Sequence, residues 1–122
     1  MIRLNFVLYR NQNLSREKFQ LYWRETHGPL VASVQRALGI RRYVQNHTAD
    51  DAMSQGFREA REGMHDPPDG IASLWFDTRE ELAAAFESPE GREAGQLLLE
   101  DEKKFIDLER SPIWLAQEIA QI

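Results

Sequence analysis

Residues 71–76 (IASLWF) constrain the fold of this chain more than any other segment, because the run is apolar on both faces of a strand. Alternate side chains of an extended strand point to opposite sides, so Ile71 and Trp75 share one face and three further apolar residues share the other. Apolar side chains on both faces require cover on both sides. The sequence therefore predicts an inner strand whose sheet is packed against other structure on each face.

Strand and helix patterns alternate along the rest of the chain. One helix is expected after the N-cap Ser15. A second helical region begins at the capping box of Thr78 and Glu81 and restarts at Ser88-Pro89. Alternation of apolar and polar residues, or an apolar run, predicts the strands. These are expected at residues 2–9, 40–47, 71–76 and 112–119.

The helix that begins after Ser15 is expected to break at Gly28-Pro29. Glycine suits the left-handed position after a helix end, and the residue before a proline is disfavoured in the α region. His27 then lies in or next to the last helical turn. A further helical piece is expected to run to Leu38.

The order β-α-β-β-α-β is that of a ferredoxin-like α+β fold with an antiparallel sheet. We expect residues 1–122 to form a single domain, with residues 48–69 as an inserted cap segment. Helices cover only one face of such a sheet. The apolar content of both faces of the third strand predicts that a second copy covers the other face, in a twofold homodimer that joins the sheet faces.

Composition and motifs exclude several classes of protein. The 122 residues contain no cysteine and only three histidines, which lack metal-ligand spacing, so no metal site is expected. The net charge of −5 disfavours nucleic acid as a partner. No leader and no apolar run of membrane-spanning length is present, so we expect a cytoplasmic protein. The chain has no glycine-rich nucleotide loop, and no cofactor is expected.

Two runs of residues resemble the EthD family, a member of the dimeric α/β-barrel superfamily. The runs are Phe19-x-x-Tyr22-Trp23-x-x-x-His27-Gly28-Pro29-Leu30-Val31 and Gly39-Ile40-x-x-Tyr43-x-x-Asn46-His47. The resemblance extends over nearly the whole chain and implies two sheets packed face to face across a twofold axis. Members of the family are linked to alkyl-ether degradation without an assigned reaction. Related barrels include polyketide cyclases, dehydratases, decarboxylases, isomerases, quinone-forming monooxygenases and haem-degrading enzymes.

The haem-degrading relatives are a specific comparison, because their pattern combines three residues. Asn5 and Trp75 match the asparagine on strand one and the tryptophan on strand three. The relatives also carry a haem-ligating histidine on a following helix, and residues 78–122 contain no histidine. The resemblance therefore does not extend to haem binding.

His27 is the first candidate catalytic residue, and two interpretations are open. It shares a helix face with Phe19 and Trp23 at spacings of four residues. Partial burial there favours a neutral imidazole, suited to removing a proton next to a carbonyl. The alternative is a histidine that binds a free carbonyl at a helix C-terminus. The family resemblance favours the first interpretation, because the matching histidine lies at the pocket in relatives.

Tyr43 is the second catalytic candidate. In related methylmuconolactone isomerases, a histidine at the matching helix end and a tyrosine at the matching strand position line the active site. A phenol there donates a hydrogen bond to a developing enolate oxygen. The alternative is a tyrosine packed in the sheet with its hydroxyl at the rim.

Further residues are candidates for binding a small apolar molecule. His47 shares a strand face with Tyr43. It is either a second acid or base, or a group that binds a polar part of the substrate, or it is an exposed residue at the end of the strand. Phe19, Trp23 and Trp75 are aromatic and suit either a pocket wall or the core. Phe57, with Met53 and Met64, suits either a lid or a surface helix.

Three functions remain open on these grounds. The first is a cofactor-free lyase, isomerase or cyclase that moves protons on an apolar carbonyl or polyketide-like compound, with His27 as base and Tyr43 as donor. The second is a cofactor-independent, quinone-forming monooxygenase that uses the same residues. The third is a non-catalytic protein that binds a hydrophobic metabolite.

Overall fold

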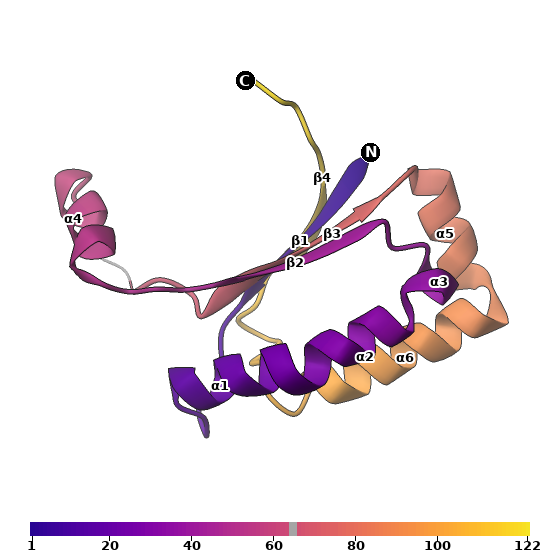
Figure 1. The fold of residues 1–122 in the computed structure, drawn as a ribbon, viewed down its shortest axis with the longest axis horizontal. Coiled ribbons are helices and arrows are strands. Elements are labelled where there is room, and N and C mark those ends of the chain that lie inside the picture. Colours follow the sequence, from indigo (N-terminus) through magenta and orange to yellow (C-terminus); the bar gives the residue numbers. More distant parts are fainter. Residues whose placement is uncertain (64–65) are drawn as a thin grey trace.

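A computed structural model of the chain describes residues 1–63 and 66–122, and it confirms the predicted order of strands and helices (Figure 1). The strands are β1 (Ile2–Leu8), β2 (Arg42–His47), β3 (Gly70–Phe76) and β4 (Ile113–Gln117). The helices are α1 (Arg16–Tyr22), the π-helical turn η1 (Trp23–His27), α2 (Gly28–Ser33), α3 (Gln35–Leu38), α4 (Ala52–Ala60), α5 (Arg79–Glu87) and α6 (Pro89–Glu102).

The four strands form one antiparallel sheet in the order β2-β3-β1-β4. Strand β3 is therefore an inner strand, as its two apolar faces predict. Figure 1 shows the sheet almost edge-on, with the helices α1, α2, α3 and α6 in a layer on one side. In residues 1–63 and 66–122, the other side carries no helix layer, and the α+β arrangement expected from the sequence is confirmed.

The strand register decides which side chains face the helices. Leu74 of β3 pairs with Leu4 of β1 and with Tyr43 of β2, and all three point toward the helix layer. The next position of β3, Trp75, points to the open face. Its ring lies beneath the guanidinium group of Arg3 at 5.0 Å. The core is therefore built between the sheet and the helices, from one face only.

The first helix does not break at Gly28-Pro29, which corrects the expectation from the sequence. Gly28 has right-handed helical angles (φ −55°, ψ −52°), and its N–H donates to the carbonyl of Trp23, five residues earlier. This hydrogen bond closes the π-helical turn η1, which is wider than an α-turn and admits Pro29 without ending the helix. His27 consequently lies within a continuous helical segment. The left-handed glycine is Gly39 (φ 71°), which ends α3.

The inserted segment of residues 48–69 carries α4, which Figure 1 shows beyond the end of the sheet and apart from the helix layer. None of the residues of α4 is buried, and Met53 and Phe57 are 73% and 61% exposed. Met64, the third apolar residue of the predicted lid, lies outside the described residues. Among the helices of the described segments, none is long and apolar enough to cross a membrane.

Candidate active site

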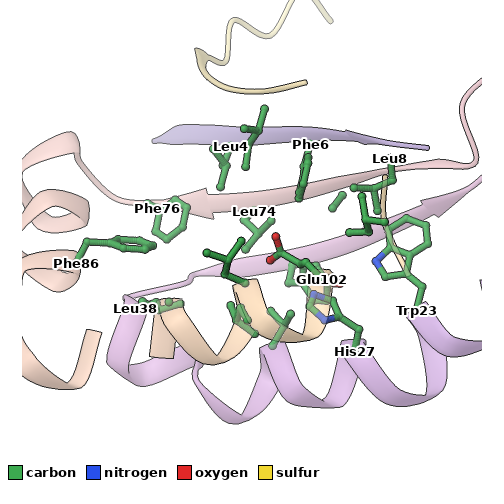
Figure 2. A pocket seen from close by; sticks show the side chains of 18 residues that line it. Leu4, Phe6, Leu8, Trp23, His27, Leu38, Leu74, Phe76, Phe86 and Glu102 are labelled. Carbon is green, nitrogen blue, oxygen red and sulfur yellow. The ribbon is translucent and has the colours of Figure 1, made fainter. Parts of the chain in front are cut away.

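A cavity of about 190 Å³ lies between the sheet and the helix layer (Figure 2). Strands β1 and β3 contribute only apolar side chains to its wall, among them Phe6, Leu74 and Phe76. Polar groups reach it from four side chains, which are His27, Tyr43, Glu102 and, through its indole N–H, Trp23. An apolar cavity of roughly 150 Å³ is large enough to hold benzene. The cavity therefore suits a compact, mostly apolar compound of about one ring with few polar atoms.

His27 reaches this cavity from the π-helical turn, and its ring is held from behind by an acidic side chain. Its Nδ1 lies 2.8 Å from Oδ2 of Asp101 on α6. The other carboxylate oxygen of Asp101 accepts a hydrogen bond of 2.6 Å from the hydroxyl of Tyr22. His27 and Asp101 are both buried. Asp101 thus fixes the orientation of the imidazole from the side opposite to the cavity.

The protonation states of this pair follow from their surroundings. Burial lowers the pKa of His27 below its ordinary value of 6.5, and the carboxylate of Asp101 offsets only part of that effect. Burial by itself raises the pKa of Asp101, but hydrogen bonds from Tyr22 and His27 outweigh it, so that this pKa is lowered. A neutral imidazole beside a carboxylate carries its proton on Nδ1. Nε2 then keeps a free electron pair and is the basic atom of the ring.

Tyr43 is oriented by a chain of hydrogen bonds along β2. The amide nitrogen of Gln45 donates to the Tyr43 hydroxyl oxygen (2.8 Å) and to the carbonyl of Trp23 (2.9 Å). Its amide oxygen lies 2.7 Å from Nε2 of His47, which therefore donates. The Tyr43 oxygen thus accepts from Gln45, with the indole N–H of Trp23 as a second donor beside it, and its own proton is left to donate into the cavity. Burial raises the pKa of Tyr43, so the phenol is neutral at ordinary pH.

Glu102, in the last turn of α6, turns its carboxyl group into the apolar cavity. Figure 2 shows this group at the same end of the cavity as the imidazole of His27. Within the described residues, no hydrogen bond to the Glu102 carboxyl is found. Burial, followed by the charge of the neighbouring Asp101, raises the pKa of Glu102 to about 7. Glu102 is therefore a weak acid that is protonated in part near neutral pH.

The structure brings some of the predicted site residues together and separates others. His27, Tyr43 and Trp23 line the cavity. Phe19 does not line it; it is fully buried behind Trp23, at a ring distance of 5.7 Å. The ring of His47 packs against the ring of Trp23, with 4.4 Å between the centroids. His47 does not line the cavity; it orients Gln45, which in turn orients Tyr43.

The remaining two candidates lie away from the cavity. Trp75 faces the open side of the sheet, because the alternation of β3 puts it opposite to Leu74 and Phe76. Its indole nitrogen donates to Glu118 at 2.5 Å. Phe57 is exposed on α4, and none of the described residues of the segment 48–69 lines the cavity. The described part of that segment therefore does not form a cap over it.

Three polar residues of the site were not among the sequence candidates. Asp101 lies seven residues after Ala94 and three after Leu98, so an acid in the apolar stripe of a helix was the signal for it. Gln45 stands between Tyr43 and His47 on one strand face, which was visible in the sequence. Nothing in the sequence distinguishes Glu102 from the other acids of α6, because its importance depends on where the helix meets the sheet.

The donor set does not suggest a metal centre. Asp101 is engaged by His27 and Tyr22, which leaves Glu102 as the one carboxyl group that faces the cavity among the described residues. In residues 1–63 and 66–122, no cluster of three His, Asp or Glu side chains is arranged to hold a metal ion. What the arrangement offers is acid–base chemistry: a basic imidazole nitrogen, a phenol that donates, and a weak carboxylic acid.

The fold and this cavity define a ferredoxin-like α+β protein with a small-molecule-sized pocket between helices and sheet. The family model described as the EthD domain matches residues 11–109, and the chain therefore belongs to the EthD family. Among curated proteins, none matches the chain significantly.

Solved structures of the same fold are similar in shape and distant in sequence. An ethyl tert-butyl ether D (EthD) family protein from Bacillus halodurans is 19% identical, with a TM-score of 0.63 over 98% of this chain and 99% of that one. A dimeric protein of unknown function with a ferredoxin-like fold from Bacteroides fragilis is 8% identical, with a TM-score of 0.59 over 96% and 95%. A protein from Nitrosomonas europaea, provisionally assigned as an antibiotic biosynthesis monooxygenase, is 15% identical, with a TM-score of 0.54 over 98% and 100%. These likenesses establish the ferredoxin-like fold.

Proposed function

We propose that the protein is a cofactor-free enzyme that moves a proton on a compact, apolar carbonyl compound, with His27 as the base. The observation that carries this proposal is the pairing of His27 with Asp101 at 2.8 Å behind an apolar cavity. The pairing leaves the basic Nε2 of a neutral imidazole for a substrate in that cavity. A base of this kind contributes roughly 10²–10⁴-fold to a proton-transfer rate.

In the proposed step, Nε2 of His27 takes a proton from the carbon next to the carbonyl group. The electron pair of the C–H bond moves to the carbonyl oxygen, and an enolate forms. The hydroxyl of Tyr43, held by Gln45 with its proton free to donate, stabilises the charge on that oxygen. Asp101 is a positioning residue that stabilises the imidazolium form of His27. Return of the proton to another carbon completes an isomerisation. Loss of hydroxide from the next carbon, protonated by His27 as it leaves, gives a dehydration, and attack of the enolate on a second carbonyl gives a cyclisation. In a decarboxylation, loss of carbon dioxide forms the enolate instead, and a protonated His27 returns a proton to the carbon.

Deuterium exchange tests this proposal without knowledge of the natural substrate. Cyclohexanone and acetophenone are incubated with the protein in deuterated buffer, and loss of the α-proton signal is followed by NMR. We expect exchange to be faster than in buffer for at least one of them. The variant His27→Gln should lose about 100-fold or more of that gain. The exposed control Glu100→Gln should keep it, and an equal rate in His27→Gln and the wild type would exclude His27 as the base.

A second candidate function is a quinone-forming monooxygenase. The fold similarity to the Nitrosomonas europaea protein favours it, and the same cavity would serve. Here His27 removes the proton of a phenol, the phenolate reduces molecular oxygen, and the products are a quinone and water. Oxygen consumption in the presence of a dihydroxynaphthalene, dependent on His27, distinguishes this reaction from proton transfer alone. A protein that only binds its ligand would show neither exchange nor oxygen consumption.

We further propose that two copies pair through the open faces of their sheets. That face carries Trp114, which is 46% exposed, alongside the stacked Trp75 and Arg42. The dimeric Bacteroides fragilis protein of the same fold supports this assembly. Light scattering after size-exclusion chromatography should give a dimer mass for the wild type and a monomer mass for Trp114→Glu. Leu21→Glu, on the exposed side of α1, is the control and should stay dimeric.

A further inference from the structure

Glu102 is a partly buried acid that the proposed step does not use. Its carboxyl group enters a cavity whose other lining is apolar except for His27, Tyr43 and the indole N–H of Trp23. A carboxyl group placed in such surroundings without a hydrogen-bond partner is costly unless a ligand supplies one. No lysine or arginine of the described residues lines the cavity, so the partner is not a cation of this part of the chain. The arrangement indicates that the bound compound supplies the hydrogen-bond partner of the Glu102 carboxyl group.

Glu102 and Tyr43 both line the same cavity, and its volume of about 190 Å³ places both groups within reach of one compact ligand. No hydrogen bond joins them among the described residues, so the proton of each is free to bind a ligand. Each offers a proton when neutral. Two neutral donors in an apolar site are a known way to bind an oxygen that becomes negative, as in ketosteroid isomerase.

We infer that the Glu102 carboxyl and the Tyr43 hydroxyl form a two-donor clamp for one oxygen atom of the ligand. The ligand class is therefore a compact apolar ketone that enolises, or a phenol, with that oxygen between the two groups. The inference rests on the proposed function, because the clamped oxygen is the one that becomes negatively charged when His27 removes the proton. In that step the proton passes from carbon to His27, while the clamp donates two hydrogen bonds and transfers no proton.

The groups that face Glu102 determine how the clamp depends on pH. Glu102 shares the cavity wall with His27 from η1 and Tyr43 from β2, and its charged neighbour on its own helix is Asp101. Strands β1 and β3 present only apolar side chains to the cavity. Asp101 is ionised and His27 neutral above the ordinary histidine pKa of 6.5. Tyr43 is neutral there too. Glu102 is thus the group of this cluster that changes charge near pH 7, and its ionised form repels an anionic ligand.

A phenolate that is ionised across the whole pH range is the probe for this clamp. We choose 2,4-dinitrophenol, whose anion is coloured, and measure its dissociation constant by absorbance between about pH 6 and pH 9. Binding to the wild type should weaken about tenfold per pH unit above about pH 7, because each bound phenolate requires a protonated Glu102. Glu102→Gln keeps a donor without the charge change, so its dissociation constant should not vary over this range.

Two further variants separate the clamp from the base. Tyr43→Phe should bind the probe about 5- to 10-fold more weakly at every pH and keep the same pH dependence. His27→Gln should also keep that dependence, whereas it loses the deuterium exchange of the proposed function. The exposed control Glu100→Gln should match the wild type.

Each failure has its own signature. A flat pH profile in the wild type, or no binding of the probe near pH 6, would overturn the clamp and leave the role of His27 standing. Loss of the proposed function with an intact pH profile would show a clamp that serves binding alone. If Glu102→Gln does not fold, as judged by circular dichroism, the profiles of the wild type and Tyr43→Phe still decide the question.

Discussion

Asp101 contacts His27 across 2.8 Å between two buried side chains, and this pair joins α6 to the π-helical turn η1. The contact carries both structural and chemical consequences. It fixes one helix against another through a polar group in the apolar stripe of α6, and it decides which nitrogen of the imidazole is basic. The following four predictions test this relationship and the others that shape the cavity.

Removal of the Asp101 carboxylate should destabilise the fold. Asp101→Ala leaves the buried Nδ1–H of His27 and the hydroxyl of Tyr22 without their acceptor. A buried donor without a partner costs about 1–3 kcal/mol, so the free energy of unfolding should fall by at least that amount. Urea denaturation at pH 7 measures it. Glu100→Ala, one residue earlier and exposed, should change stability by less than about 0.5 kcal/mol, and an equal effect of both variants would contradict the prediction.

The two described histidines should be opposite tautomers. Asp101 accepts the proton on Nδ1 of His27, whereas the amide oxygen of Gln45 accepts the proton on Nε2 of His47. Burial lowers the pKa of both rings, so both should be neutral at pH 7. Long-range ¹H–¹⁵N NMR spectra distinguish the tautomers, and His27→Gln and His47→Gln assign the signals. A His47 proton on Nδ1 would refute the hydrogen-bond chain along β2, and a His27 proton on Nε2 would refute the pairing with Asp101.

Replacement of Gly28 by alanine should destabilise the protein more while Gln45 is present than in its absence. Gly28 is helical, so alanine alone would favour the helix by about 0.5–1 kcal/mol. Its Cβ, however, would lie 3.0 Å from Nε2 of Gln45, whose amide is held by three hydrogen bonds. We expect Gly28→Ala to cost about 1 kcal/mol in the wild type and clearly less in the Gln45→Ala variant, where only the 3.3 Å approach to the Trp23 carbonyl remains. Thermal denaturation of the four proteins gives the coupling, and additive effects would count against it.

Glu102→Gln should stabilise the protein increasingly as the pH rises. The pKa of Glu102 is raised from 4.5 to about 7 by burial and by Asp101. A raised carboxyl pKa means that the unfolded chain ionises more readily than the folded one, so the native protein loses stability as the pH rises from 4.5 toward 7. The substitution removes that loss, which we put at about 1–3 kcal/mol above pH 7. Urea titrations at several pH values measure the difference, and a constant difference at all pH values would disprove the raised pKa.

The sequence determined the strands, the helices and their order, because these depend on local periodicity. The alternation of residues 2–9 and the two apolar faces of residues 71–76 required an inner strand in an antiparallel sheet, and the structure has it. The face shared by Tyr43, Gln45 and His47 was also determined, since side chains of a strand alternate strictly. The EthD resemblance, now matched by the family model, rested on the same local run of residues.

Only the tertiary structure decided which polar groups meet. His27 and Asp101 are 74 residues apart, and the pattern of one helix does not show what the other presents to it. Gly28-Pro29 was expected to end a helix, but the wider π-turn, closed by the Gly28 N–H and the Trp23 carbonyl, kept it continuous. Trp75 and Leu74 differ by one position and lie on opposite sides of the sheet. The propensity for helix or strand is a property of one segment, whereas a site forms where several segments pack together. Burial in that packed site then sets the pKa of groups such as Glu102.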